Sequence, residues 1–237
     1  VFAQRFNDAA SIAHAIAGFA VFCALSGVVY IVNDIVDVAQ DREHPKKRHR
    51  PIAAGRISPG VAGAGAVVLT VVAVLVSFVV LPPLFGVLAV TYLLLVCAYS
   101  FRLKHMVVLD ILALAMGFVL RALAGIVVID IYPENPIPIT SYFLLTTLFL
   151  ALFLASAKRR SEMSLLGEEA GSHRRVLKDY SQEFLDVILT VATAGTIFSY
   201  ALWTTQGGLS HPRGGVGGVG TEAWLLVLTM PFVLYGM

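Results

Sequence analysis

The chain has 237 residues, of which 58% are hydrophobic and 14% are charged, and its mean hydropathy is +0.83. Soluble domains carry roughly 25% charged residues, so this composition excludes a water-soluble globular protein. The net charge of +2 is too small an excess to indicate a nucleic-acid partner, and none is expected. Cys23 and Cys97 lie in separate apolar segments, so we predict neither a disulfide nor a zinc site.

Long uncharged segments predict membrane-spanning helices, because about 20 apolar residues cross the hydrocarbon core of a bilayer. The uncharged segment 57–101 must hold two helices, since Pro82 and Pro83 lack backbone donors and interrupt it. The predicted spans are residues 8–32, 59–81, 84–100, 106–129, 140–157 and 184–206, and a seventh begins near residue 221. The expected fold is therefore all-α, a polytopic transmembrane helical bundle.

The two ends of the chain indicate a piece of a longer protein. The first residue is Val1 rather than Met, and the seventh span is still apolar at Met237. No signal-peptide pattern precedes the first span. We therefore expect residues 1–237 to form a single transmembrane domain that is truncated at both ends.

Lys and Arg are distributed unequally between the two sides of the predicted bundle. Fourteen of the 17 lie in the loops after spans one, three and five, whereas the opposite connections contain only Arg213. Because Lys and Arg concentrate in cytoplasmic loops, we predict a multi-pass protein of the cell membrane with these three loops in the cytoplasm. Eleven of the 15 acidic residues lie on the same side, which indicates a polar site that faces the cytoplasm.

Three regularly spaced aspartates follow the first span. If the helix continues there, Asp34, Asp37 and Asp41 lie on one face, and each close pair repels by about 1–4 kcal/mol at 4 Å. A cation is therefore needed to offset their charge. Carboxylates without a nearby Cys favour Mg2+, which proteins usually hold through one or two carboxylates together with substrate phosphates. The alternative is a solvated helix end that the following basic loop neutralises.

The loop after the aspartates is strongly basic, with Lys46, Lys47, Arg48 and Arg50 among its cations. Taken alone, it is typical of a cytoplasmic loop that meets anionic lipid headgroups. Beside metal-binding aspartates it predicts a diphosphate site, because Arg makes bidentate contacts with phosphate and Lys supplies a point charge.

Two later segments carry further candidate residues. Arg121 lies inside the fourth span, where a charge is costly and normally has a partner, so an interior ion pair or hydrogen bonds are favoured over substrate contact. The segment 158–162, Lys-Arg-Arg-Ser-Glu, ends the fifth span. The sequence leaves two interpretations of it open, a second half of the site and a membrane-interface anchor.

The aspartate segment, Asn-Asp-x-x-Asp-x-x-x-Asp from Asn33, resembles the first aspartate-rich motif of the UbiA superfamily of intramembrane prenyltransferases. Tyr99-Ser100 with Lys104, and Leu120-Arg121 followed by Ala124-Gly125, resemble later signatures of that superfamily in the same order. The resemblance implies a bundle of nine transmembrane helices, of which this chain would hold helices two to eight.

Residues 157–162 narrow the resemblance, because they stand where prenyltransferases with aromatic acceptors carry a second aspartate-rich motif. Together with residues 41–55 they resemble the decaprenyl-phosphate phosphoribosyltransferase branch. This implies a Mg2+-dependent transferase that moves a 5-phosphoribosyl group from 5-phosphoribosyl 1-diphosphate to a polyprenyl phosphate, such as decaprenyl phosphate, and releases diphosphate. The predicted catalytic residues are Asp34 and Asp37, the metal ligands Asp34, Asp37 and Asp41, and the substrate-binding residues Asn33, Lys46, Lys47, Arg48, Arg50, Tyr99, Lys104, Arg121, Lys158, Arg159 and Glu162.

Two other functions are left as alternatives. The first is a UbiA-type prenyltransferase that joins a prenyl diphosphate to an aromatic acceptor. The second, a transporter, is disfavoured because its coupling charges would lie near the bilayer midplane rather than at one interface. The expected partners are therefore a polyprenyl phosphate lipid, phosphoribosyl diphosphate and the bilayer, and a homo-oligomer is left open.

Overall fold

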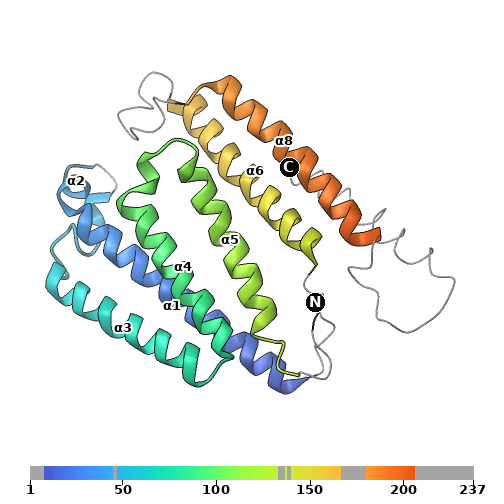
Figure 1. Cartoon of the computed structure of the whole chain (residues 1–237). Helices are drawn as coiled ribbons and strands as arrows, with labels where there is room; N and C mark the ends of the chain where they lie inside the picture. Colours follow the sequence, from blue (N-terminus) through green and yellow to red (C-terminus); the bar gives the residue numbers. More distant parts are fainter. Residues whose placement is uncertain (1–7, 45–46, 133–136, 138–139, 167–179, 206–237) are drawn as a thin grey trace. The chain divides into compact units, whose positions relative to one another are not determined.

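The computed structural model describes residues 8–44, 47–132, 137, 140–166 and 180–205, and all regular structure in these ranges is helical (Figure 1). The α-helices are α1 (Ala9–Val36), α2 (Val38–Glu43), α3 (Pro59–Val79), α4 (Pro83–Phe101), α5 (Leu109–Val127), α6 (Ser141–Leu166) and α8 (Gln182–Thr205). Two short 3-10 helices, η1 (Lys47–His49) and η2 (Leu103–His105), lie in the connections.

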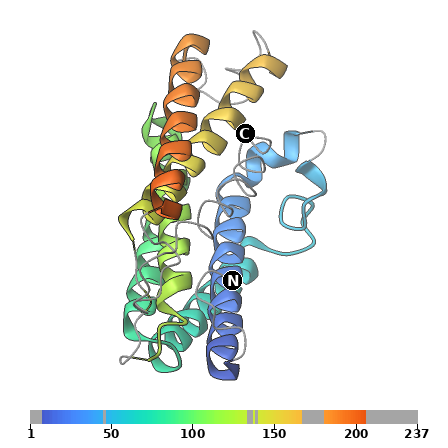
Figure 2. The ribbon, with the colours of Figure 1, turned by 90° about the vertical axis from the view of Figure 1, so that its right-hand side faces the viewer.

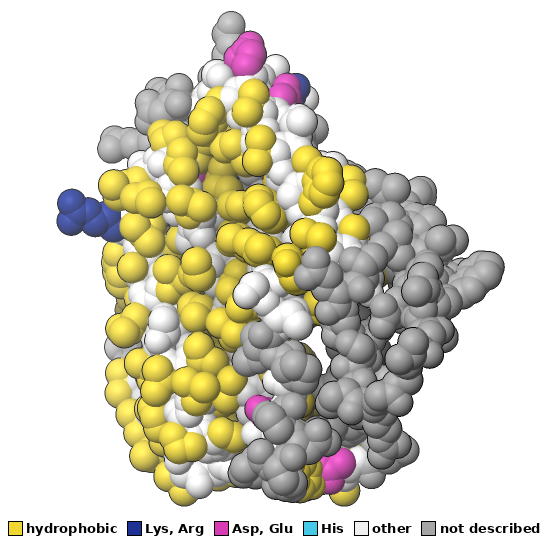
Figure 3. Space-filling view, turned by 45° about the vertical axis from the view of Figure 1, so that its right-hand side comes forward, with side chains coloured by type: hydrophobic (Ala, Val, Ile, Leu, Met, Phe, Trp, Pro, Cys, Tyr) yellow, Lys and Arg dark blue, Asp and Glu magenta, His cyan; other side chains and the backbone are white. Residues whose placement is uncertain are grey.

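Six of these helices, all except α2, are long and apolar enough to cross a membrane. They coincide with the first six predicted spans and confirm an all-α, multi-pass membrane protein, while the predicted seventh span lies outside the described residues. Large hydrophobic side chains such as Phe19 and Val79 are exposed, as lipid contact requires, and hydrophobic side chains cover most of the described surface in Figure 3. Two helices run further than predicted: α1 ends at Val36, and α6 continues past Ala157 to Leu166.

Local sequence explains where several helices begin. The side chain of Asp8 caps α1 by accepting a hydrogen bond from the Ser11 N–H at 2.9 Å. Ser58 caps α3 in the same way, and Pro59 occupies the first helical position, where its missing N–H costs no hydrogen bond. Pro83 likewise opens α4.

The packing divides the chain into two compact units. Of the described residues, the first contains 8–44, 47–101 and 124–132, and the second contains 102–123, 137, 140–166 and 180–205. The sequence predicted a single domain, and that organisation stays a prediction. In the first unit α1, α3 and α4 pack against one another, and the ring of Phe22 on α1 makes T-shaped contacts with the rings of Phe85 and Tyr92 on α4.

In the second unit α6 packs along α8, and the two helices lie side by side in Figure 1. The beginning of α5 joins them through a buried cluster of Ile111, Ala155, Tyr180 and Leu185. Gly195 on α8 allows a close approach to α6, because a Cβ atom there would lie only 2.5–2.7 Å from ring atoms of Phe149.

The approach of α6 and α8 gives a testable prediction. Gly195→Ala should lower the free energy of unfolding by about 1–3 kcal/mol, because the added methyl group overpacks the contact with Phe149. Gly27→Ala is the matched control, since Gly27 lies inside α1 and a Cβ there meets nothing within 4 Å. The measurement is thermal unfolding of both variants in detergent. Equal or higher stability of Gly195→Ala relative to Gly27→Ala would contradict the close contact.

Candidate functional site

The three aspartates lie where α1 passes into α2. Asp37 separates the two helices with φ −91° and ψ 9°, yet the hydrogen bonds of an α-helix continue across it. The Asp37 N–H donates to the Asn33 carbonyl at 2.8 Å, and the Asp41 N–H donates to the Asp37 carbonyl at 2.8 Å. Asp34 and Asp41 therefore stay about two turns apart on one side of the chain.

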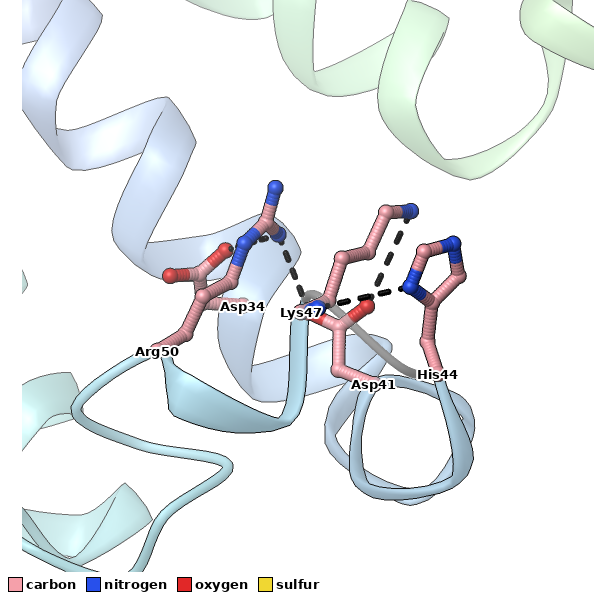
Figure 4. A network of polar contacts seen from close by, with 5 residues as sticks. All are labelled: Asp34, Asp41, His44, Lys47 and Arg50. Atoms are coloured by element: carbon pink, nitrogen blue, oxygen red, sulfur yellow. Dashed lines mark hydrogen bonds and ion pairs between the residues drawn. The ribbon is translucent and has the colours of Figure 1, made fainter.

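Arg50 joins these two aspartates (Figure 4). Its Nη1 atom donates to Asp34 Oδ1 at 2.7 Å and to Asp41 Oδ2 at 2.9 Å, so the two carboxylates converge on one nitrogen. The Nζ atom of Lys47 lies 3.8 Å from the other oxygen of Asp41. The Asp41 side chain is only 3% exposed, compared with 23% for Asp34 and 42% for Arg50. The acidic pair thus lies at the edge of the protein interior with its cation on the solvent side.

The basic loop folds back toward α1 because several hydrogen bonds fix its path, which Figure 2 shows as a return beside α1 and α2. Arg42 Nε donates to the Ala53 carbonyl at 3.3 Å, and the Lys47 N–H donates to His44 Nδ1 at 3.3 Å. Gly55 has a φ of 73°, a left-handed conformation that side chains with a Cβ disfavour. This return brings Arg50 to the aspartates.

An apolar cavity of about 340 Å³ lies beside Asp34. Its lining comes from α1, α3 and the loop between them, and consists of Tyr30, Ile31, Asp34, Pro51, Ile52, Ile57, Val61, Ala62 and Gly65. Asp34 is the one charged member of this lining. The carboxylate therefore stands between a polar loop and an apolar space.

For the other predicted site residues that are described in the first unit, the structure gives the exposure of the side chain. Arg48 is exposed on η1, whereas Asn33 and Tyr99 are partly buried. Lys46 lies outside the described residues. Within the described ranges no three His, Cys, Asp or Glu side chains are grouped closely enough to hold a metal ion. Asp34 and Asp41 therefore converge as a pair. The role of Asp37 as a third ligand stays a prediction.

The second unit contains a buried ion-pair network around Arg159. Arg159 Nε donates to Asp110 Oδ2 at 2.8 Å, and its Nη1 donates to Glu162 Oε2 at 3.0 Å. The Arg159 side chain is 1% exposed and that of Asp110 is 0% exposed. The network thus ties the beginning of α5 to the C-terminal part of α6.

Tyr180, just before α8, completes this network. Its hydroxyl donates to Asp110 Oδ1 at 2.5 Å and accepts a hydrogen bond from the Val108 N–H at 2.7 Å. Burial raises the pKa of Tyr180, and its hydrogen bond to Asp110 raises that pKa further. Tyr180 therefore remains a protonated donor at neutral pH, and three segments meet at one carboxylate.

This network changes the interpretation of the segment 158–162. The sequence left a second half-site and an interface anchor open. In the structure Arg159 pairs with both Asp110 and Glu162, and Lys158 is exposed. The sequence analysis gave neither Asp110 nor Tyr180 a role in the site. The available signal was Asp110 itself, because a carboxylate at the beginning of a membrane span requires a partner.

Two further predicted residues lie in the second unit. Arg121 is exposed on α5, where its Nε donates to the Gly117 carbonyl at 3.2 Å and its guanidinium lies 4.5 Å from the centroid of the Phe118 ring. Lys104 lies in η2 and is partly buried. Substrate contact for both residues stays a prediction.

The sequence matches the UbiA prenyltransferase family over residues 2–236. The chain belongs to this family. It is 34% identical over 216 residues to the decaprenyl-phosphate phosphoribosyltransferase of Mycobacterium tuberculosis (strain ATCC 25618 / H37Rv), covering 91% of this chain and 66% of that protein. It is 42% identical over 204 residues to the protein of the same name from Corynebacterium glutamicum, covering 84% of this chain and 58% of that protein.

The fold is also that of a solved UbiA protein. A UbiA homolog from Archaeoglobus fulgidus bound to GPP and Mg2+ superposes with a TM-score of 0.74 at 19% identity, covering 96% of this chain and 75% of that chain. The family match confirms the resemblance drawn from the aspartate segment. The chain spans about two thirds or less of the length of the two phosphoribosyltransferases.

The contrast between two adjacent arginines gives a second prediction. Arg159→Ala should lower the free energy of unfolding by about 3–5 kcal/mol, because it leaves the carboxylate of Asp110 buried without its cation. Arg160→Ala is the matched control, since Arg160 pairs with Asp186 at 2.9 Å on the exposed surface, where a pair contributes about 0–1 kcal/mol. Thermal or denaturant unfolding in detergent measures both. Similar losses in the two variants would contradict the buried network.

Proposed function

We propose that this protein transfers a 5-phosphoribosyl group from 5-phosphoribosyl 1-diphosphate to a polyprenyl phosphate such as decaprenyl phosphate and releases diphosphate. The observation that carries the proposal is the convergence of Asp34 and Asp41 on a single cationic atom inside a basic loop. The identity of 34–42% to two proteins named decaprenyl-phosphate phosphoribosyltransferase supports the choice of substrates.

The aspartate pair fits a divalent metal. One nitrogen already lies within hydrogen-bond distance of both carboxylates, so a cation at this position contacts both. Two carboxylates that leave the remaining positions to substrate phosphates are the usual protein environment of Mg2+. We assign Asp34 and Asp41 as ligands, with Asp37 as the third. When bound, Mg2+ would neutralise charge on the departing diphosphate. The A. fulgidus homolog, bound to GPP and Mg2+, supports this metal.

The basic loop binds the phosphates of the donor in this proposal. Lys47, Arg48 and Arg50 all expose their side chains on the same loop. A donor with a 5-phosphate and a 1-diphosphate is compact and highly anionic, so it requires several cationic donors. The further candidates for substrate contact are Lys46 of the same loop and Asn33, Tyr99, Lys104, Arg121, Lys158, Arg159 and Glu162. The buried network around Arg159 supports a positioning role for that residue.

The reaction is a substitution at the anomeric carbon of the ribose. An oxygen of the lipid phosphate forms the new bond to this carbon, and the bond to the diphosphate oxygen breaks. The lipid phosphate is already an anion, so no general base is required. The apolar cavity beside Asp34 supports a place for isoprenoid carbons next to the reacting phosphate.

A direct assay tests the proposed function. The full-length protein with radiolabelled 5-phosphoribosyl 1-diphosphate and decaprenyl phosphate should yield a labelled lipid in a Mg2+-dependent reaction. Asp34→Asn and Asp41→Asn should each lower kcat/KM at least about a hundredfold, because removing a group that stabilises the leaving diphosphate costs roughly 3–4 kcal/mol. GPP with an aromatic acid is the parallel reaction. Product in that reaction alone would establish the prenyltransferase alternative.

The sidedness of the site is a further part of the proposal. The excess of Lys and Arg in three loops supports a location at the cytoplasmic face of the cell membrane, where a soluble sugar donor is available.

Cysteine accessibility measures this sidedness. In a background of Cys23→Ser and Cys97→Ser, a membrane-impermeant maleimide added to intact spheroplasts should label Arg213→Cys and not Lys47→Cys. After lysis both should react, which controls for the reactivity of each thiol. Labelling of Lys47→Cys in intact spheroplasts would reverse the orientation.

A further inference from the structure

The position between the two aspartates is already held by a cation of the protein itself. Arg50 Nη1 lies 2.7 Å from Asp34 Oδ1 and 2.9 Å from Asp41 Oδ2. A Mg2+ ion binds oxygen ligands at about 2.0–2.1 Å, so an ion that bridges the same two oxygens would overlap the guanidinium. The metal and Arg50 therefore exclude each other at these two carboxylates.

Without a metal the protein requires this guanidinium. The Asp41 side chain is 3% exposed and has a second carboxylate, that of Asp34, within reach of the same nitrogen. Two like charges at the edge of the interior, with little water around one of them, are costly unless a cation is present. Lys47 offsets this charge less, because its Nζ is 3.8 Å from Asp41 and its side chain is 48% exposed.

The same guanidinium is able to leave without disrupting the core. Its side chain is 42% exposed and comes from the loop that follows η1, not from a packed helix face. Its partners are anions on one side, and solvent lies on the other. A diphosphate that arrives with the metal offers Arg50 new anionic oxygens, with which it can form bidentate contacts.

We propose that Arg50 is an exchangeable counter-cation of the aspartate pair. In the free protein it neutralises Asp34 and Asp41; when a divalent metal binds them together with a diphosphate group, the guanidinium is displaced and donates to the phosphate oxygens instead. This inference rests on the proposed function for the metal and the donor. It makes the metal and the diphosphate bind with positive coupling, because the metal alone displaces Arg50 without giving it a new partner.

Binding experiments on the full-length protein test this coupling without any turnover. Equilibrium dialysis with radiolabelled Mn2+ alone gives the affinity for the metal. Dialysis with radiolabelled pyrophosphate at saturating Mn2+ gives the affinity for the diphosphate group. The variants are Arg50→Gln and, as the matched control, Arg56→Gln, which removes the same charge from an exposed residue of the same loop.

The two measurements should change in opposite directions in Arg50→Gln. Mn2+ alone should bind Arg50→Gln roughly fivefold to tenfold more tightly than it binds the wild-type protein, because the competing ion pair is removed. Pyrophosphate with Mn2+ should bind at least about tenfold more weakly, because a charge-assisted contact is lost. Arg56→Gln should change both affinities by less than about twofold, as expected for an exposed charge in high dielectric. A residue that only binds phosphate would alter the second affinity and not the first.

Two results separate failure of this inference from failure of the proposed function. If Mn2+ alone binds Arg50→Gln and Arg56→Gln with the same affinity, Arg50 does not compete with the metal and the inference is wrong, while the proposed function stands. If the wild-type protein and both variants bind neither Mn2+ nor pyrophosphate, the metal site itself is wrong.

If Arg50→Gln elutes as an aggregate, Arg50→Lys replaces it. This variant keeps a cation that forms fewer hydrogen bonds, so both affinities should shift in the same two directions by smaller factors. No shift in either affinity would overturn the inference.

Discussion

Two carboxylates with almost no solvent exposure, Asp41 in the first unit and Asp110 in the second, determine how the polar segments of each unit are assembled. A buried carboxylate without a cation is costly, so each must bring a basic residue from another segment. Asp41 draws the basic loop back to the end of α1 through Arg50, and Asp110 joins α5 to α6 through Arg159. The apolar helices supply the spans, and these two ion pairs determine which polar segments lie together within each unit.

The two pairs differ in the exposure of their cation, and this difference separates a structural role from a functional one. Arg159 is 1% exposed, and moving it would leave two charges in a medium of low dielectric. Arg50 is 42% exposed, so water and phosphate are able to replace its contacts. Both arginines were predicted to bind substrate, yet burial suits one to hold helices together and exposure suits the other to exchange partners.

The sequence predicted the spans and the family because both depend on local patterns. The length of the apolar segments predicted six helices to within a few residues, except at the C-terminal ends of α1 and α6, where each helix continues into polar residues beyond its apolar part. The helical spacing indicated the pair of Arg159 and Glu162, three residues apart, but the longer-range pairing inside each polar cluster was not predictable. Four neighbouring cations were candidates for the aspartates, and the return of the loop places Arg50 on both carboxylates and Lys47 near Asp41 alone. The partners of Asp110 lie 49 and 70 residues away, a separation that no spacing rule covers.

Asp34 lies between a polar and an apolar environment, and the proposed reaction needs both, one for the soluble donor and one for the lipid acceptor. On one side it meets Arg50 and the basic loop, where a soluble and highly anionic donor can bind. On the other it lines an apolar cavity whose remaining walls carry no charge. A metal held by this carboxylate would lie at the boundary between the basic loop and the apolar cavity. The phosphate of a polyprenyl lipid has to bind at such a boundary, because its tail remains in the hydrocarbon. A carboxylate deeper in α1 would lack the cations it needs, and one further along α2 would lie away from the lipid.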